Sequence, residues 1–164
     1  MEPPSILRKG LTILALKVPV KFHPKGDAES ELTKCVVLIS ADPQVCEAVR
    51  QALPDWIILT TETLQAVEEF LESREIGVVL CDKDSLSPDW RAAVSSLSNL
   101  PHRACVIVLA RTAGWNDLDE VIQAGGYEVL RAPYTPEQLL RAVKSAWSYW
   151  RSQRRLRMRR ELSA

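Results

Sequence analysis

Short apolar runs alternate with amphipathic segments five times between residues 35 and 150 of this 164-residue chain. The runs contain four to six residues and are rich in Val, Ile and Leu, which is typical of strands buried on both faces. They lie at residues 36–39, 56–59, 76–81, 105–109 and 127–130. The segments after them repeat apolar residues every three or four positions, which indicates helices with one buried face. This alternation predicts an α/β fold in which helices cover both faces of a parallel sheet.

Local signals mark where the expected helices begin and end. Asp42, Ser87 and Thr135 each precede a proline; such side chains can cap free backbone N–H groups, and proline suits the first helical position. Thr61 can cap the second helix, and Gly125 follows the fourth helix, where a glycine commonly ends one. About 116 residues in this arrangement is the size of one flavodoxin-like (βα)5 domain. We therefore expect a doubly wound parallel sheet with strand order 2-1-3-4-5.

Charge divides the chain into three parts, although the formal net charge is zero. Residues 1–34 carry +2, residues 35–150 carry −7 and residues 151–164 carry +5. We expect residues 1–34 to be a partly disordered N-terminal extension, in which residues 11–22 could dock as an edge strand. Residues 35–150 form the expected domain, and residues 151–164 extend its last helix as a basic tail.

Composition and motifs disfavour several classes of protein. An apolar content of 46% with 26% charged residues fits a soluble globular domain, and no apolar run approaches the roughly 18 residues that span a membrane. No secretory signal is evident, so we expect a cytoplasmic protein. The chain lacks the Gly-rich phosphate-binding patterns of nucleotide-binding proteins. The cysteines share no CxxC spacing, which disfavours zinc and favours buried free thiols at Cys35, Cys46, Cys81 and Cys105.

One apolar run, residues 77–81, stops abruptly at two carboxylates, Asp82 and Asp84. The carboxyl end of a buried parallel strand is where open α/β sheets place their chemistry. A core strand that runs into an ordinary polar loop has the same pattern. The stretch therefore makes Asp82 a candidate site residue without assigning it a role.

Residues 35 to about 150 resemble the receiver domain of two-component response regulators. The resemblance rests on the strand that ends in Asp82, the run at 106–109, Ala-Gly-Gly-Tyr at 124–127, and residues 130–139. The last stretch is the most specific: it reads Leu-Arg-Ala-Pro-Tyr-Thr-Pro-Glu-Gln-Leu, where receivers commonly carry Lys-Pro-Phe-x-Pro-Glu-Glu-Leu. The resemblance implies a flavodoxin-like fold and a role in two-component or phosphorelay signalling.

The resemblance places the phosphoacceptor aspartate of the family on Asp82. The acidic pair that holds Mg²⁺ together with that aspartate falls on Ser40 and Ala41, so both of those carboxylates are missing. Mg²⁺ is usually held by carboxylates together with phosphate and water oxygens. We therefore expect no cofactor, and Mg²⁺ only if Asp82 is active.

Other receiver positions are also altered. The Thr or Ser that binds the phosphoryl group falls on Ala110, and the aromatic switch residue falls on Val129. The near-invariant lysine falls on Ala132, while the proline after it is retained as Pro133. Phosphoryl transfer is catalysed mainly by positioning and by neutralising charge, so these losses imply a degenerate receiver.

Neighbouring residues offer a partial replacement for the missing groups. Asp42 and Asp84 could join Asp82 in a weaker metal site, with Arg111 or Arg131 as substitute cations. Each has a simpler interpretation as well: Asp42 as a helix cap, Asp84 as a loop residue, and both arginines as solvated side chains.

The basic tail contains six arginines, at Arg151, Arg154, Arg155, Arg157, Arg159 and Arg160. It could be a solvated helix end, because cations suit the carboxyl end of a helix dipole. It could contact nucleic acid, which needs clustered Arg or Lys. It could also form an amphipathic helix that meets another protein or a second copy. The acidic body makes nucleic acid the weaker of the two binding hypotheses.

These observations favour a standalone pseudo-receiver that acts by protein–protein interaction in the cytoplasm and is not an enzyme. A hydrolase is disfavoured because Ser40 has no evident base. We expect a protein partner or a second copy to bind the surface between residues 115 and 150, and no membrane contact. The interface candidates are Trp115, Tyr127, Tyr134, Trp147 and Trp150. The alternatives are a working phosphoreceiver with a rearranged metal site and a nucleic-acid accessory protein.

Overall fold

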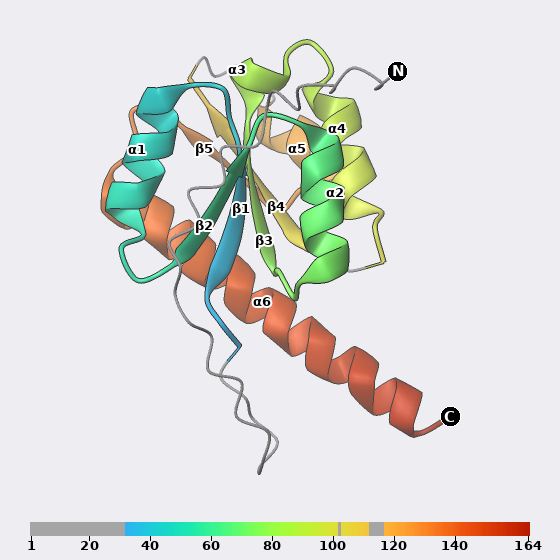
Figure 1. Cartoon of the computed structure of the whole chain (residues 1–164). Coiled ribbons are helices and arrows are strands. Elements are labelled where there is room, and N and C mark those ends of the chain that lie inside the picture. The colour runs from blue at the N-terminus through green and yellow to red at the C-terminus, as the bar shows by residue number, and fades with distance from the viewer. Residues whose placement is uncertain (1–31, 102, 112–116) are drawn as a thin grey trace, which may run out of the picture.

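The computed structural model describes residues 32–101, 103–111 and 117–164. Its centre is a five-stranded parallel sheet in the order β2-β1-β3-β4-β5, which confirms the predicted fold and strand order (Figure 1). The strands are β1 (Cys35–Ile39), β2 (Ile57–Thr61), β3 (Val78–Asp82), β4 (Cys105–Ala110) and β5 (Glu128–Arg131). The three central strands are buried along their whole length, as their continuous apolar runs predict.

Helices cover both faces of the sheet. One face carries α1 (Pro43–Ala52) and α6 (Pro136–Leu162), and the other carries α2 (Leu64–Ser73), α4 (Trp90–Ser98) and α5 (Asp117–Gln123) (Figure 1). Alternate residues of the strands point to the two faces, so that Val36 and Leu38 pack under α1 and α6 while Val37 and Ile39 pack under α2 and α4. The result is two hydrophobic cores that share one sheet.

A short helix, α3 (Lys83–Leu86), follows β3 directly and was not predicted. Asp82 begins it, because its carboxylate accepts a hydrogen bond from the Asp84 N–H. Ser87 ends α3 instead of opening the next helix, and α4 begins only after Asp89, so the predicted Ser-Pro helix start was wrong. The polar residues after β3 had enough capping chemistry to form their own helical turn.

Two other helix starts follow the sequence signals more closely. Asp42 caps α1 by accepting from the Gln44 N–H, and Thr135 caps α6 through a capping box with Gln138. The cap of α2 is Thr63, two residues later than the predicted Thr61. Thr61 instead ends β2, where its hydroxyl accepts from the Thr63 N–H.

The last helix, α6, is much longer than the sheet that it covers. Its first half buries Leu139, Val143, Ala146 and Trp150 against the sheet. The helix then continues without a break to Leu162, so the basic tail does extend it, as predicted. In Figure 1 this second half (red) leaves the body of the protein beyond the amino ends of the strands.

Some predictions lie outside the described residues, among them the edge strand at residues 11–22 and the interface candidate Trp115. The four cysteines lie inside and are all buried free thiols, as expected. Within the described ranges, no helix has the length and apolar character to cross a membrane.

Candidate functional site

Asp82 is the last residue of β3, and its side chain is buried at the carboxyl edge of the sheet. The strands β1 and β4 pair with β3 on either side. The residues that follow these two strands, Ser40 and Arg111, therefore converge on Asp82. Parallel pairing alone explains this convergence, because the carboxyl ends of parallel strands share one edge.

Both carboxylate oxygens of Asp82 accept hydrogen bonds from neighbouring residues. Oδ2 accepts from the Ser40 hydroxyl at 2.7 Å and from the Ser85 hydroxyl at 2.6 Å. Oδ1 accepts from the Asp84 N–H at 3.3 Å. Such bonds offset the cost of burying a charged carboxylate. The same hydrogen bonds occupy both carboxylate oxygens, with which an aspartate would attack a phosphodonor.

The two serines connect this carboxylate to the loop that follows β1. Ser85 Oγ accepts from the Ala41 N–H at 3.0 Å, and Ser40 Oγ accepts from the Asp42 N–H at 3.1 Å. Each hydroxyl thus donates to Asp82 and accepts from the backbone of the loop. The loop and α3 are held together through Asp82.

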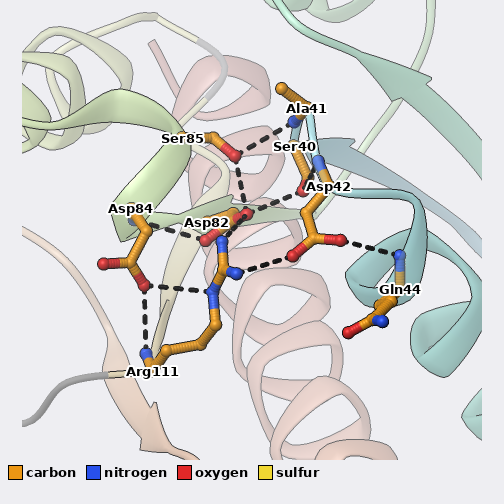
Figure 2. Close-up of polar contacts among 8 residues, drawn as sticks. All are labelled: Ser40, Ala41, Asp42, Gln44, Asp82, Asp84, Ser85 and Arg111. Carbon is orange, nitrogen blue, oxygen red and sulfur yellow. Dashed lines mark hydrogen bonds and ion pairs between the residues drawn. The ribbon is translucent and has the colours of Figure 1, made fainter.

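Arg111 brings a positive charge to this edge of the sheet. Its guanidinium lies 2.7 Å from Asp42 Oδ2, 3.3 Å from Asp84 Oδ2 and 3.7 Å from Asp82 Oδ2 (Figure 2). Its backbone N–H also donates to Asp84 Oδ2 at 3.3 Å. We call Arg111, Asp42, Asp82 and Asp84 the arginine clamp. One cation that extends from the end of β4 is thereby shared among three carboxylates, which lie before α1, at the end of β3 and in α3.

The clamp places a guanidinium where the three carboxylates could otherwise share a metal ion. Mg²⁺ requires a nearly octahedral set of oxygen ligands at about 2.0–2.1 Å, whereas these oxygens surround a planar group with fixed donors. Over the described part of the chain, no three Asp, Glu, His or Cys residues are arranged to hold a metal. The residues present therefore fit an internal arginine and do not fit the Mg²⁺ that the resemblance implies.

Several sequence interpretations change at this site. Asp42 is a helix cap and also an ion-pair partner, and Asp84 lies in α3 instead of a loop. Arg111 is not merely solvated, although about half of its side chain is exposed. Arg131 is exposed at the end of β5 and forms no part of the clamp. Ser40 donates to the Asp82 carboxylate, a contact that the sequence did not predict.

The remaining altered receiver positions lie at the ends of β4 and β5. Ala110 is buried, and its carbonyl accepts from the Ala132 N–H at 2.8 Å. At these two positions, where receivers carry a hydroxyl and an ammonium group, this protein presents methyl groups. Val129 is partly buried in the core, and Pro133 is exposed.

Lys83 lies next to Asp82 in the sequence, but it points to another acidic residue. Its Nζ is 3.2 Å from Asp117 Oδ1, a buried carboxylate at the start of α5. The same ammonium group lies 5.2 Å from the centre of the Trp90 ring. Sequence reasoning missed this pair because the two partners are 34 positions apart and no local pattern connects them.

The aromatic interface candidates have mixed outcomes. Trp150 is buried, and Trp147 is partly buried with its ring edge-on to Trp56 at 5.7 Å, so Trp150 offers a partner little surface. Tyr134 is partly buried, and burial raises the pKa of its hydroxyl, with the nearby Asp82 charge adding to the rise. Apolar side chains near β5 that do reach solvent were not singled out: Leu118, Ile122 and Tyr149.

Tyr127 occupies the middle of this aromatic surface. Its hydroxyl is 2.8 Å from Ser145 Oγ, and its ring centre is 5.6 Å from that of Tyr149. Both partners lie on α6, so Tyr127 joins the start of β5 to that helix. It is partly buried and remains a candidate for contact with a partner.

Comparisons with solved structures place this fold among receiver domains. A response regulator from Thermotoga maritima superimposes with a TM-score of 0.64 at 20% identity, covering 71% of this chain and 99% of that one. The signal receiver domain of an HD domain-containing protein from Pseudomonas fluorescens gives 0.69 at 17% identity, covering 80% and 98%. No family model matches the sequence, and no curated protein matches it. The chain therefore has the receiver fold, at sequence identities that agree with a divergent site.

Proposed function

We propose that this protein is a receiver-fold signalling module that works by binding another protein and does not use Mg²⁺-dependent phosphorylation. The observation that carries the proposal is the arginine clamp. Its guanidinium already forms ion pairs with the carboxylates that would have to bind the metal. The receiver fold supports a role in two-component or phosphorelay signalling, where the partner would be another signalling protein.

The chemistry of phosphoryl transfer supports this proposal. Transfer to a carboxylate needs a metal ion or fixed cations against the oxygens of the transferring group. Asp82 instead uses Oδ2 to accept two hydroxyl hydrogen bonds, and alanines occupy the positions that would bind the phosphoryl oxygens. The buried Asp82 then has a structural role, in which it holds Ser40 and Ser85 in place.

The partner surface that we propose is formed by α5, β5 and the first half of α6. Leu118 and Ile122 lie one turn apart on α5 and are about half exposed, as is Tyr149 on α6. Exposed apolar and aromatic side chains of this kind are typical anchors of protein interfaces. The resemblance to receivers supports the same surface, because receivers often use it to bind partners.

Phosphodonor chemistry gives the decisive experiment. The purified protein is incubated with acetyl phosphate and Mg²⁺, and its intact mass is measured beside that of a conventional receiver treated in the same way. We expect the mass of this protein to stay unchanged while the conventional receiver gains a phosphoryl group. A stable gain that Asp82→Asn abolishes would establish the alternative, a working phosphoreceiver with a rearranged metal site.

The same phosphodonor experiment on an Arg111 variant tests the arginine clamp itself. Arg111→Ala exposes the three carboxylates to solvent while Ala110 and Ala132 remain unable to bind a phosphoryl group. We expect this variant also to stay unmodified, because the groups that stabilise the transition state are still missing. Rapid phosphorylation of Arg111→Ala would show instead that the arginine is a removable inhibitor of an active site.

A further inference from the structure

We propose that the arginine-rich end of α6 docks on the acidic face of α2 in a second copy of this chain. The arginine segment comprises residues 151–164, and the acidic face comprises the exposed carboxylates of residues 62–75. This surface lies apart from the α5–β5–α6 surface assigned above to a signalling partner. The inference therefore does not depend on the proposed function.

The charges of the two surfaces are complementary. The arginine segment carries six arginines and one glutamate, for a net charge of +5. Residues 62–75 carry five glutamates and one arginine, for a net charge of −4. Four of these glutamates are exposed and the fifth is partly exposed; they are Glu62, Glu68, Glu69, Glu72 and Glu75. Opposite potentials of this size favour association and orient the two partners.

The path of α6 carries the end of the segment away from the acidic face of its own chain. The helix is straight past Trp150 and continues for twelve more residues to Leu162, about 18 Å at the rise of an α-helix. Figure 1 shows this part leaving the body beyond the lower end of α2. Within one chain, Arg154 forms an ion pair with Glu75, at the point where α6 passes the end of α2. That contact shows the pairing chemistry within one chain.

Apolar side chains lie among the arginines of the segment. Leu156 is 49% exposed, Met158 is 46% exposed and Leu162 is 88% exposed. These side chains are available to pack against a partner helix. Burial of such side chains against a partner helix adds a hydrophobic contribution to the electrostatic one.

A second copy fits these features better than a polyanion does. Nucleic acid that approached the arginines would also approach a body with a charge of −7, which would repel it. A second copy offers the acidic face itself. Because each copy carries both surfaces, two copies related by a two-fold axis can make the contact twice, as in other isologous dimers.

Charge reversal in the full-length protein tests the proposal. One variant reverses the segment with Arg157→Glu, Arg159→Glu and Arg160→Glu. The other reverses the helix with Glu68→Lys, Glu69→Lys and Glu72→Lys. Sedimentation equilibrium at low salt is used to measure dimerisation of the wild type, of each variant alone and of their equimolar mixture.

We expect the wild type to dimerise, and its dissociation constant to rise at least tenfold from low salt to about 0.5 M salt as the charges are screened. Each variant alone should be monomeric, because its segment and its α2 then carry the same sign of charge. The mixture should dimerise as the wild type does, since every contact is again between opposite charges. This recovery also shows that both variants are folded.

Three results would overturn the inference. The first is a wild type that stays monomeric at low salt, or a mixture that does not recover. The second is a dimer that Ile122→Arg abolishes and the charge reversals do not, which would place self-association on the α5–β5–α6 surface. The third is a monomer that binds duplex DNA through the arginines with strong salt dependence. Arg111→Ala should dimerise as the wild type does, so failure of the clamp proposal is distinguishable.

Discussion

At the scale of single residues, Arg111 is a cation that is tethered to the chain beside three carboxylates. A guanidinium keeps its charge at every physiological pH and offers donors in a planar fork that suits carboxylates. Because Arg111 is covalently part of the chain, the site cannot gain or lose this cation when the Mg²⁺ concentration changes. The clamp therefore joins the end of β4, the loop after β1 and the junction of β3 and α3 through a cation that is always present.

Replacing Arg111 with alanine should lower the free energy of unfolding. Three carboxylates would lose their shared cation, and we expect a loss of about 1–2 kcal/mol, a figure reduced because half of the arginine side chain is exposed to solvent. Urea denaturation measures the change. Arg131→Ala is the matched control, since that arginine is exposed and outside the clamp, and it should change stability by no more than about 0.5 kcal/mol. Equal losses in both variants would contradict the clamp.

The buried cysteines make stability fall at alkaline pH. Burial raises the pKa of Cys81 to about 12, and those of Cys35 and Cys105 to about 11, from an ordinary value of 9.0. The charge of Arg74 partly opposes the rise at Cys35, and that of Arg157 partly opposes the rise at Cys105. The unfolded chain releases these protons first. The contribution of the neutral thiols is therefore complete below about pH 9 and is lost as pH rises towards 11–12.

Urea midpoints at about pH 8 and about pH 10 test this expectation. The midpoint should fall at the higher pH, and it should fall less when Cys81 is replaced by alanine. An identical fall in Cys81→Ala would assign the alkaline effect to other groups.

At the scale of elements, one of the contacts between α6 and the sheet region is especially close. Gly77 lies just before β3, and a Cβ atom built there would be 2.5 Å from Trp150 Cε3. That distance is far inside van der Waals contact, so glycine is required by space and not by an unusual backbone angle. The Trp150 indole belongs to the same hydrophobic core as Val78, the first residue of β3.

Gly77→Ala should therefore destabilise the protein by displacing the Trp150 ring. The expected loss is about 1–3 kcal/mol, which is typical of overpacking in a core. Urea denaturation followed by far-ultraviolet circular dichroism measures it. A double-mutant cycle with Trp150→Leu supplies the control: the smaller side chain should relieve the clash, so the two losses should not add. Additive losses would show that Gly77 matters for another reason.

At the scale of the whole molecule, the two charged features lie at opposite ends of the sheet. The arginine clamp lies at the carboxyl ends of the strands, and the arginine segment extends beyond their amino ends (Figure 1). Screening weakens interactions over more than about 10 Å at ordinary ionic strength. The two features therefore act independently, one within a chain and one between chains.

Millimolar Mg²⁺ should leave the thermal stability of the wild-type protein unchanged. A ligand stabilises a protein only when it binds the folded state, and the clamp leaves no suitable oxygen set for the ion among Asp42, Asp82 and Asp84. Differential scanning fluorimetry with Mg²⁺, using Na⁺ at matched ionic strength as the control, measures the midpoint. A rise of the midpoint with Mg²⁺ alone would contradict the metal-independent proposal.

Local sequence patterns determined the fold, because strands and helix caps depend on neighbouring residues. The five apolar runs predicted the sheet, and the caps at Asp42 and Thr135 were correct. Trp150 is an interface candidate by residue type, but the structure buries its ring against Gly77, 73 positions earlier in the chain. A pattern within one helix does not state which of its faces a distant strand will cover.

The candidate site likewise combines features that the sequence identified with features that only the tertiary structure decided. The sequence by itself identified Asp82, its missing receiver partners, and Arg111 as one of two possible cations. Only the tertiary structure selected Arg111 and made Asp42 and Asp84 its partners, because β4 lies beside β3 while Arg131 ends the edge strand β5. Ion pairs depend on distances in space, and parallel pairing brings together residues that are far apart along the chain.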